Sequence, residues 1–242
     1  MQSDYASRYR QLYEQHWWWR SRESVILPLV DQFAAGRTDL RMLDIGCGDG
    51  LFFDRLSQYG KTWGVEVDES IVSEDGPHRD RIQVGPFDES YQVDDPLSLV
   101  LMLDVLEHLD EPEACLRHAL SLLGRDGLAI ITVPAFNTLW TRHDDINHHR
   151  TRYTKRTFRS VAEAAGMHID RCEYFFHWVV FAKLLVRLKE TLIQGEPKPA
   201  ELPSPPVNQL LRTLSKAERA ATRWLHLPFG SSLLVIGRKM HS

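Results

Sequence analysis

A glycine-rich segment near residue 46 constrains the fold of this chain more than any other feature of its sequence. Residues 42–45 form a short apolar run that is typical of the end of a buried strand, and apolar residues return at helical spacing from Leu51. Between them lie Gly46, Gly48 and Gly50, which favour a tight turn and let the backbone approach a ligand closely. The segment therefore predicts a strand, a loop and a helix, with the amide-rich N-terminus of the helix directed at a ligand.

The acidic residues around this loop indicate the charge of that ligand. Dinucleotide-binding loops space their glycines as G-x-G-x-x-G, whereas this loop has G-x-G-x-G. Asp44 and Asp49 would repel a pyrophosphate, but they would attract a ligand that carries ammonium and sulfonium groups. About twenty residues after Gly46, Glu66 lies near the end of a second apolar strand, where its carboxylate can accept hydrogen bonds from both ribose hydroxyls. We therefore expect a cationic ligand that contains a sugar.

Three segments of the sequence together resemble the class I S-adenosylmethionine-dependent methyltransferases. Residues 43–50, 64–66 and 104–109 match the glycine loop, the ribose-binding acid and the turn after the fourth strand in that family. The resemblance covers roughly the first 135 residues. It implies S-adenosylmethionine as cofactor and S-adenosyl-L-homocysteine as product. It also implies an α/β fold with a Rossmann-like, doubly wound, seven-stranded and mostly parallel sheet.

The same resemblance implies which residues bind the cofactor. A third strand is expected at residues 81–85, and in similar enzymes the residues after it hold the adenine. Here Pro86 and Phe87 stand between the glycine and the acid, which departs from the usual pattern. The fourth strand is an almost unbroken apolar run, typical of a strand that is buried on both faces. The implied cofactor-binding set is Asp44, Gly46, Cys47, Gly48, Glu66, Val67, Phe87, Asp88, Leu103 and Asp104.

The composition is that of a single globular domain. The chain has 242 residues, of which 43% are hydrophobic and 26% are charged, so it has enough apolar mass for one large core. We expect a single methyltransferase domain made of an N-terminal helical cap (residues 1–36), a cofactor-binding core (37–174), a helical insertion before the last strand (175–230), and the last strand with a tail (231–242).

Charge, cysteine content and hydropathy argue against several classes of protein. A net charge of -4 means that the chain lacks the overall positive charge that is typical of proteins that bind nucleic acid. The three cysteines form no C-x-x-C pair, which argues against a disulfide framework and against a thiolate zinc site. There is neither a charged-then-apolar leader nor an apolar run of about 18 residues. We therefore expect a cytoplasmic protein without a membrane span.

Three adjacent tryptophans, residues 17–19, stand in an N-terminal segment that is rich in tyrosine and arginine. They cannot all face one core, so in one interpretation they partly cover the edge of the domain and keep an indole N–H in water. In the other, the segment is a lid over the cofactor or an aromatic wall for the substrate. Similar methyltransferases often carry a His-Trp-Trp segment before the first strand.

The segment after the fifth strand, residues 135–154, carries most of the information about the substrate. It has three histidines and two aspartates within seven residues, which is too polar for a core. One interpretation is that a histidine acts as general base or positions the methyl acceptor. The candidates are His143 and His149, together with His108, which otherwise only caps a helix after the fourth strand.

Two other interpretations of this segment remain open. A metal would be bound by His143, by Asp144 or Asp145, and by His148 or His149, but their spacing fits no standard signature, so we predict no metal ligand. Alternatively, these side chains pair with neighbouring arginines to hold the loop in place. A subset of class I methyltransferases is similar to this chain at Leu139, Trp140, His143, Asp144, His149, Arg152, Tyr153 and Thr154.

A wide apolar stripe with basic residues beside it occupies residues 175–193. Four interpretations of this stripe are open. The helix packs on the core, lies on a membrane surface, covers an apolar substrate pocket, or forms a dimer interface. Residues 195–206 are rich in proline and predict a stiff connector, and a second amphipathic helix is expected from residue 207 to residue 225.

Together these features predict methyl transfer from S-adenosylmethionine to a small-molecule acceptor. The available histidines favour an oxygen as the methylated atom, and the apolar stripe is compatible with an apolar or lipid-like acceptor, with peripheral membrane contact and with a homodimer. We expect no nucleic-acid partner. The alternatives are a nucleotide-binding oxidoreductase and a non-catalytic partner protein that keeps the methyltransferase fold.

Overall fold

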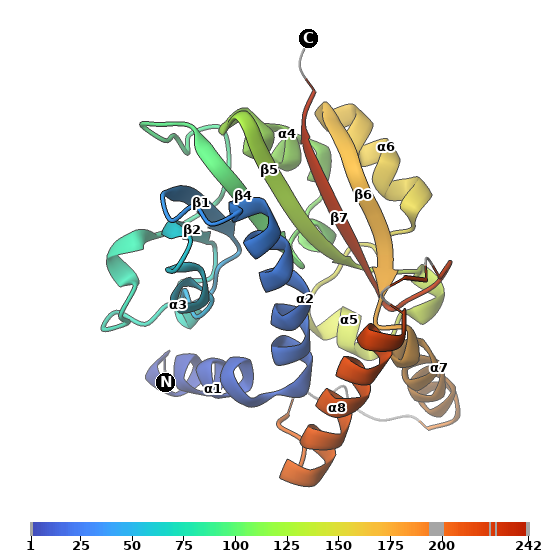
Figure 1. The fold of residues 1–242 in the computed structure, drawn as a ribbon. Helices are drawn as coiled ribbons and strands as arrows, with labels where there is room; N and C mark the ends of the chain where they lie inside the picture. The colour runs from blue at the N-terminus through green and yellow to red at the C-terminus, as the bar shows by residue number, and fades with distance from the viewer. Residues whose placement is uncertain (1, 194–200, 223, 226, 241–242) are drawn as a thin grey trace.

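A seven-stranded sheet organises the molecule, which is seen here as a computed structural model (Figure 1). The structure describes residues 2–193, 201–222, 224–225 and 227–240, with side chains from residue 8 onward. The strand order is β3-β2-β1-β4-β5-β7-β6, and only β7 runs antiparallel to its neighbours β5 and β6. The strands are β1 (Leu40–Ile45), β2 (Gly60–Glu66), β3 (Ile82–Val84), β4 (Leu97–Leu103), β5 (Leu123–Pro134), β6 (Met167–Phe175) and β7 (Ser232–Lys239). The predicted fold class is confirmed.

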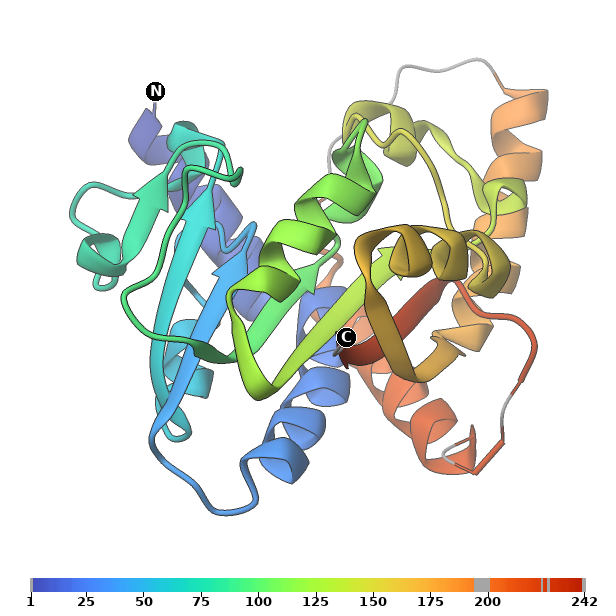
Figure 2. The ribbon, with the colours of Figure 1, turned by 90° about the horizontal axis from the view of Figure 1, so that it is seen from above.

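Helices cover both faces of this sheet, as Figures 1 and 2 show. On one face Ile26 and Val30 of α2 pack on β1, β4 and β5, and on the other face Leu116 of α4 and Phe158 of α6 pack on the same strands. All four side chains are completely buried, so they exclude water from both faces of the central strands. The longer helices are α1 (Gln2–Gln15), α2 (Trp17–Ala34), α4 (Pro112–Ser121), α6 (Lys155–Ala165), α7 (His177–Leu192) and α8 (Pro205–Thr222).

Short helices lie in the connections between the strands. They are α3 (Phe53–Leu56), η1 (Glu69–Ile71), η2 (Arg79–Arg81), η3 (Leu106–His108), η4 (Asn137–Leu139) and α5 (Arg142–Ile146). A capping box fixes the start of α5, because Asp144 accepts a hydrogen bond from the backbone N–H of Thr141 at 2.9 Å. Thr154 caps α6, and Gly166 ends that helix in the left-handed conformation.

The N-terminal segment folds as two helices that meet at His16. The imidazole Nδ1 of His16 accepts a hydrogen bond from the N–H of Trp18 at 3.2 Å and so caps α2. Trp17 then packs against Phe176 and Trp178 at the start of α7. The three tryptophans are half-buried, which both interpretations of this segment allow.

Two boundaries differ from the sequence-based expectation. The glycines at positions 124 and 127 predict a turn before the fifth strand, but these residues are part of β5, because Leu123 already pairs with Leu97 and the register is irregular between this pair and the next. Helix α8 begins at Pro205, inside the predicted connector, since proline fits the first turn of a helix without losing a hydrogen bond. Residues 195–200 of that connector lie outside the described residues.

No helix in the described ranges is both long enough and apolar enough to span a bilayer.

Candidate active site

The glycine loop follows β1 at the carboxyl end of the parallel strands. Gly46 and Gly48 have φ values of 73° and 56°, in the left-handed region that favours glycine. A Cβ added to Gly46 would lie 2.7 Å from the Cγ2 of Val105, and one added to Gly48 would lie 2.9 Å from the ring of Tyr9. The loop is thus a cradle that any side chain at these two positions would fill, which fits close approach of a ligand to the backbone.

Two acids on neighbouring strands face this loop. Glu66, at the end of β2, accepts hydrogen bonds from the N–H of Gly48 at 2.8 Å and from the N–H of Asp68 at 3.0 Å. These two amides fix the carboxylate, whose oxygens keep further lone pairs for the hydroxyls of a ribose. Asp44, near the end of β1, is 4% exposed. Burial raises its pKa to about 7; the positive charge of Arg22 opposes this shift and the charge of Glu66 adds to it.

Buried acids beside a glycine cradle fit a cationic nucleoside ligand such as S-adenosylmethionine. An ammonium or sulfonium group would stabilise the ionised form of Asp44, which burial alone disfavours. A pyrophosphate would instead add negative charge next to Asp44 and Glu66.

Helices α1 and α2 cover this loop and bring three residues to it that sequence reasoning did not assign to the site. Arg22 pairs with the carboxylate of Asp104 and donates a hydrogen bond to the carbonyl of Leu103 at 3.2 Å. Arg10 pairs with Asp49 at 2.5 Å, and the ring of Tyr9 lies over Gly48. The enrichment of tyrosine and arginine in this segment was the available signal. These contacts favour the interpretation of the segment as a lid.

The remaining predicted cofactor residues differ in their burial and contacts. Asp88 is exposed, and its carboxylate accepts hydrogen bonds from the backbone N–H and the hydroxyl of Ser90. Phe87 is half-buried and packs against His118 with ring centroids 4.9 Å apart. Val67 is 72% exposed, whereas Cys47 is buried under the loop. The assignment of these four residues to the cofactor stays a prediction.

Beyond Asp104, the structure joins two of the three predicted catalytic histidines. His108 ends η3, His149 follows α5, and their ring centroids are 4.8 Å apart in an edge-to-face arrangement. Glu107, which the sequence places beside His108 after the fourth strand, either at the site or at a helix start, is completely buried beside them. His143 lies on α5 with an exposed side chain. The candidate centre therefore consists of Glu107, His108 and His149.

Asp144 orients His149 within this centre. Its carboxylate is completely buried and lies 2.8 Å from the Nδ1 of His149, 3.3 Å from the Nε of Arg152 and 3.6 Å from the Nζ of Lys183. Burial alone would raise the pKa of Asp144, but the hydrogen bond from His149 and the positive charges of Lys183 and Arg152 outweigh it and hold the pKa below its usual range. Asp144 is therefore ionised, and its contact with Nδ1 leaves the Nε2 of His149 for another partner.

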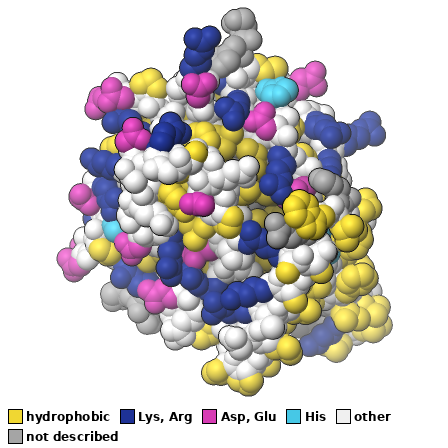
Figure 3. All heavy atoms as spheres, in the orientation of Figure 1, with side chains coloured by type: hydrophobic (Ala, Val, Ile, Leu, Met, Phe, Trp, Pro, Cys, Tyr) yellow, Lys and Arg dark blue, Asp and Glu magenta, His cyan; other side chains and the backbone are white. Residues whose placement is uncertain are grey.

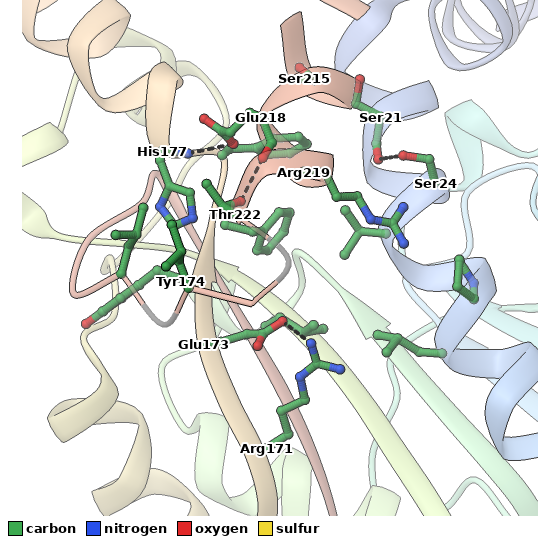
Figure 4. A pocket seen from close by; sticks show the side chains of 18 of the residues that line it. Ser21, Ser24, Arg171, Glu173, Tyr174, His177, Ser215, Glu218, Arg219 and Thr222 are labelled. Carbon is green, nitrogen blue, oxygen red and sulfur yellow. Dashed lines mark hydrogen bonds and ion pairs between the residues drawn. The ribbon is translucent and has the colours of Figure 1, made fainter. Parts of the chain in front are cut away.

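A separate cavity of about 730 Å³ lies between α2, α8 and the end of β6 (Figure 4). Its wall includes Ser21, Glu173, His177 and Glu218, and it contains none of the predicted cofactor or catalytic residues. In Figure 4 the side chain of Glu218 points toward the start of α7, where it accepts hydrogen bonds from two backbone N–H groups. This cavity therefore belongs to the packing of the helical insertion rather than to the cofactor site.

Comparison with known proteins agrees with this geometry. Residues 18–171, more than half of the chain, match the family described as methyltransferase domain. A solved S-adenosylmethionine-dependent methyltransferase from Archaeoglobus fulgidus superposes with a TM-score of 0.55 at 16% identity, over 90% of this chain and 94% of the other. A TehB-like methyltransferase from Corynebacterium glutamicum gives a TM-score of 0.56 at 19% identity, over 99% and 98%. At these identities the two structures show the shared fold.

A curated relative from Neisseria meningitidis serogroup C (strain 053442) bears the name ubiquinone biosynthesis O-methyltransferase. It is 26% identical over an alignment of 133 positions that covers 48% of this chain and 56% of the relative. The chain thus spans about half the length of the curated relatives it matches.

Proposed function

The chain belongs to the methyltransferase-domain family, whose members use S-adenosylmethionine, and from that premise we propose that it methylates an oxygen of a small-molecule acceptor held beside His149. The observation that carries this proposal is the buried Asp144–His149 pair, which stands next to His108 at the carboxyl end of β4. The names of the curated relatives, which are O-methyltransferases, support oxygen as the accepting atom.

The cofactor supplies a methyl group on a sulfonium, which is already a good leaving group. The protein therefore has to align the acceptor oxygen, the methyl carbon and the sulfur, and to accept one proton. In the reaction an O–C bond forms, the C–S bond breaks with its electron pair passing to sulfur, and the hydroxyl proton leaves the acceptor. Glu66 and the glycine loop would hold the nucleoside, and Asp44 and the Arg22–Asp104 pair would lie beside its charged end.

His149 has one of two roles in this scheme: it takes the hydroxyl proton through Nε2, or it holds the acceptor in place. Asp144 supports both roles, because its contact with Nδ1 fixes the ring and stabilises a positive charge on it.

We assign the parts of the chain to this function as the sequence predicts. Residues 1–36 form an N-terminal helical cap, residues 37–174 the cofactor-binding core, residues 175–230 the helical insertion that serves as substrate or interface element, and residues 231–242 the last strand and a tail. Helix α7 carries Leu185 and Leu192, which are 68% and 75% exposed, so the inserted part presents apolar surface to the outside. We propose that this apolar surface contacts a membrane peripherally and that the acceptor is apolar or lipid-like.

Ligand binding and turnover test the proposed function separately. We expect S-adenosylhomocysteine to raise the melting temperature of the protein and NAD to leave it unchanged. We expect the His149→Ala variant to lose at least about tenfold in the rate of methyl transfer to hydroxyl acceptors while its affinity for S-adenosylhomocysteine stays within about twofold. Stabilisation by NAD and not by S-adenosylhomocysteine would overturn the methyltransferase assignment. A loss of cofactor affinity in His149→Ala as large as its loss of rate would overturn the role of His149.

A further inference from the structure

Three side chains at the end of β4 form a cluster that the proposed reaction does not fully use. Glu107 and His108 come from η3, and His149 comes from the loop after α5. One donor atom from each of the three lies within 4.8 Å of the other two. We propose that Glu107, His108 and His149 bind a divalent transition-metal cation.

Glu107 provides the first reason. Its side chain has no exposed surface, and within the described part of the chain neither carboxylate oxygen has a hydrogen-bond partner. A buried carboxylate without a partner costs several kcal/mol, so such groups are normally paired, hydrogen-bonded or bound to a metal. The oxygens lie where the two imidazoles converge, and a cation there would supply the partner that the protein does not.

The orientation of His149 provides the second, independent reason. Histidine ligands of metals usually donate their other ring N–H to a carboxylate, which fixes the tautomer and directs the free nitrogen at the ion. Asp144 holds the Nδ1 of His149 in this way at 2.8 Å, and Lys183 and Arg152 hold Asp144 in turn. The arrangement therefore presents Nε2 of His149 as a ligand atom beside His108.

The donor set selects the class of cation. Two imidazole nitrogens and one carboxylate suit zinc, cobalt, iron or manganese, whereas magnesium and calcium prefer oxygen ligands alone. Three donors at about 2.1 Å from an ion are roughly 3–4 Å apart, so small side-chain movements close the present cluster around it. Three protein ligands also leave a position open, as in catalytic metal sites.

The role of the cation in methyl transfer rests on the proposed function, whereas the site itself does not. At the carboxyl end of β4 the open position would receive the acceptor hydroxyl, lower its pKa and fix its distance from the methyl group. A metal ion bound to Nε2 of His149 would prevent this nitrogen from taking the hydroxyl proton. His149 would then hold the acceptor in place, which is the second of its two proposed roles.

Cobalt and zinc are the probes for the site. Protein that comprises residues 1–242 is treated with EDTA and dialysed, Co²⁺ binding is followed by visible absorption, and Zn²⁺ is titrated by calorimetry. We expect one ion per chain, with affinity reduced at least about tenfold in both Glu107→Gln and His149→Ala. The matched control is His148→Asn, which removes a neighbouring exposed imidazole, and asparagine tolerates the left-handed backbone found there.

S-adenosylhomocysteine is titrated in parallel, in EDTA, with every variant. Circular dichroism and this binding show that a variant is folded, so loss of metal in a protein that binds the cofactor is specific to the site. Cofactor binding without stoichiometric metal, or metal binding that survives both ligand substitutions, overturns the metal site and leaves the methyltransferase assignment intact. Failure to bind the cofactor would instead overturn the proposed function, whatever the metal result.

Discussion

At the scale of single residues, Asp44 links cofactor binding to a cost in stability. Its pKa is raised from 3.8 to about 7 in the folded protein, so the folded state holds the proton more tightly than the unfolded chain does. The stability that this gives is complete below about pH 4 and is lost as the pH rises through 7. The loss amounts to about 4 kcal/mol at most, since one pKa unit is worth about 1.4 kcal/mol.

The Asp44→Asn variant should therefore gain stability over the wild type as the pH rises. Without cofactor, we expect the free energies of unfolding of the two proteins to differ little at pH 4–5. At pH 8 the variant should be about 1–4 kcal/mol more stable than the wild type. Urea denaturation at both pH values measures this difference. The same variant should bind S-adenosylmethionine more weakly at pH 8, because it lacks the negative charge. An equal stability difference at both pH values would contradict the shifted pKa.

A substitution at Gly48 tests directly whether the glycine loop binds the cofactor. The Gly48→Val substitution places a branched side chain at a φ of 56° and against the ring of Tyr9, where even a Cβ would lie at 2.9 Å. We expect binding of S-adenosylhomocysteine to become undetectable by calorimetry. Gly166→Val is the matched control, because Gly166 also has a positive φ but has open space around its Cβ position at the end of α6. It should lose stability but keep cofactor binding, and unchanged binding in Gly48→Val would exclude the loop as the site.

At the scale of elements, the sequence predicts local features well and their long-range pairing poorly. The glycine turn after β1 and the acid at the end of β2 each depend on residues close together in sequence, and each is found as predicted, although the helix expected after the turn is only the short α3. The pairing of Arg22 with Asp104 joins residues 82 positions apart, and the cluster of Glu107 with His149 depends on where the chain after β5 returns. No periodicity or spacing encodes such contacts, because the sheet order decides which loops meet.

Helix α7 depends on an acid from another helix. Its first residues lack a side-chain cap of their own, and Glu218 of α8 accepts hydrogen bonds from the N–H groups of His177 at 3.0 Å and Trp178 at 2.5 Å. The Glu218→Ala substitution leaves both amides without this acceptor, so we expect a loss of about 1–3 kcal/mol in the free energy of unfolding. Chemical denaturation measures the loss. The control is Glu163→Ala, an exposed acid on α6, which should change stability by less than about 0.5 kcal/mol.

At the scale of the whole molecule, charge and apolar surface are unevenly distributed. The chain has a net charge of -4, yet α7 and α8 together carry six basic and two acidic residues, a net of +4. The same helices expose large apolar side chains, and Figure 3 shows them gathered at the lower right and bottom of the molecule, over α7 and α8. These exposed residues are Phe181, Leu184, Leu185, Val186, Leu188, Leu192, Val207, Leu210 and Leu214.

This combination of basic and apolar side chains suits an anionic membrane surface. Leucines that enter the interface contribute about 1–3 kcal/mol each, and basic residues near anionic lipid contribute about 1 kcal/mol each. We therefore expect the protein to sediment with vesicles that contain phosphatidylglycerol and much less with phosphatidylcholine alone, and salt should weaken the binding.

The Leu188→Glu substitution tests whether α7 provides the membrane contact. Leu188 is exposed, so a glutamate should leave the fold unchanged while it repels anionic lipid, and sedimentation with vesicles should fall at least about fivefold. Met240→Glu is the control, because this exposed apolar residue follows β7 near the C-terminus, at the end of the molecule remote from α7 in Figure 1. Analytical ultracentrifugation tests the alternative, which is a dimer interface. If the wild type is a dimer that binds no lipid, and Leu188→Glu converts it to a monomer, then the surface of α7 contacts a second copy of the chain and not a membrane.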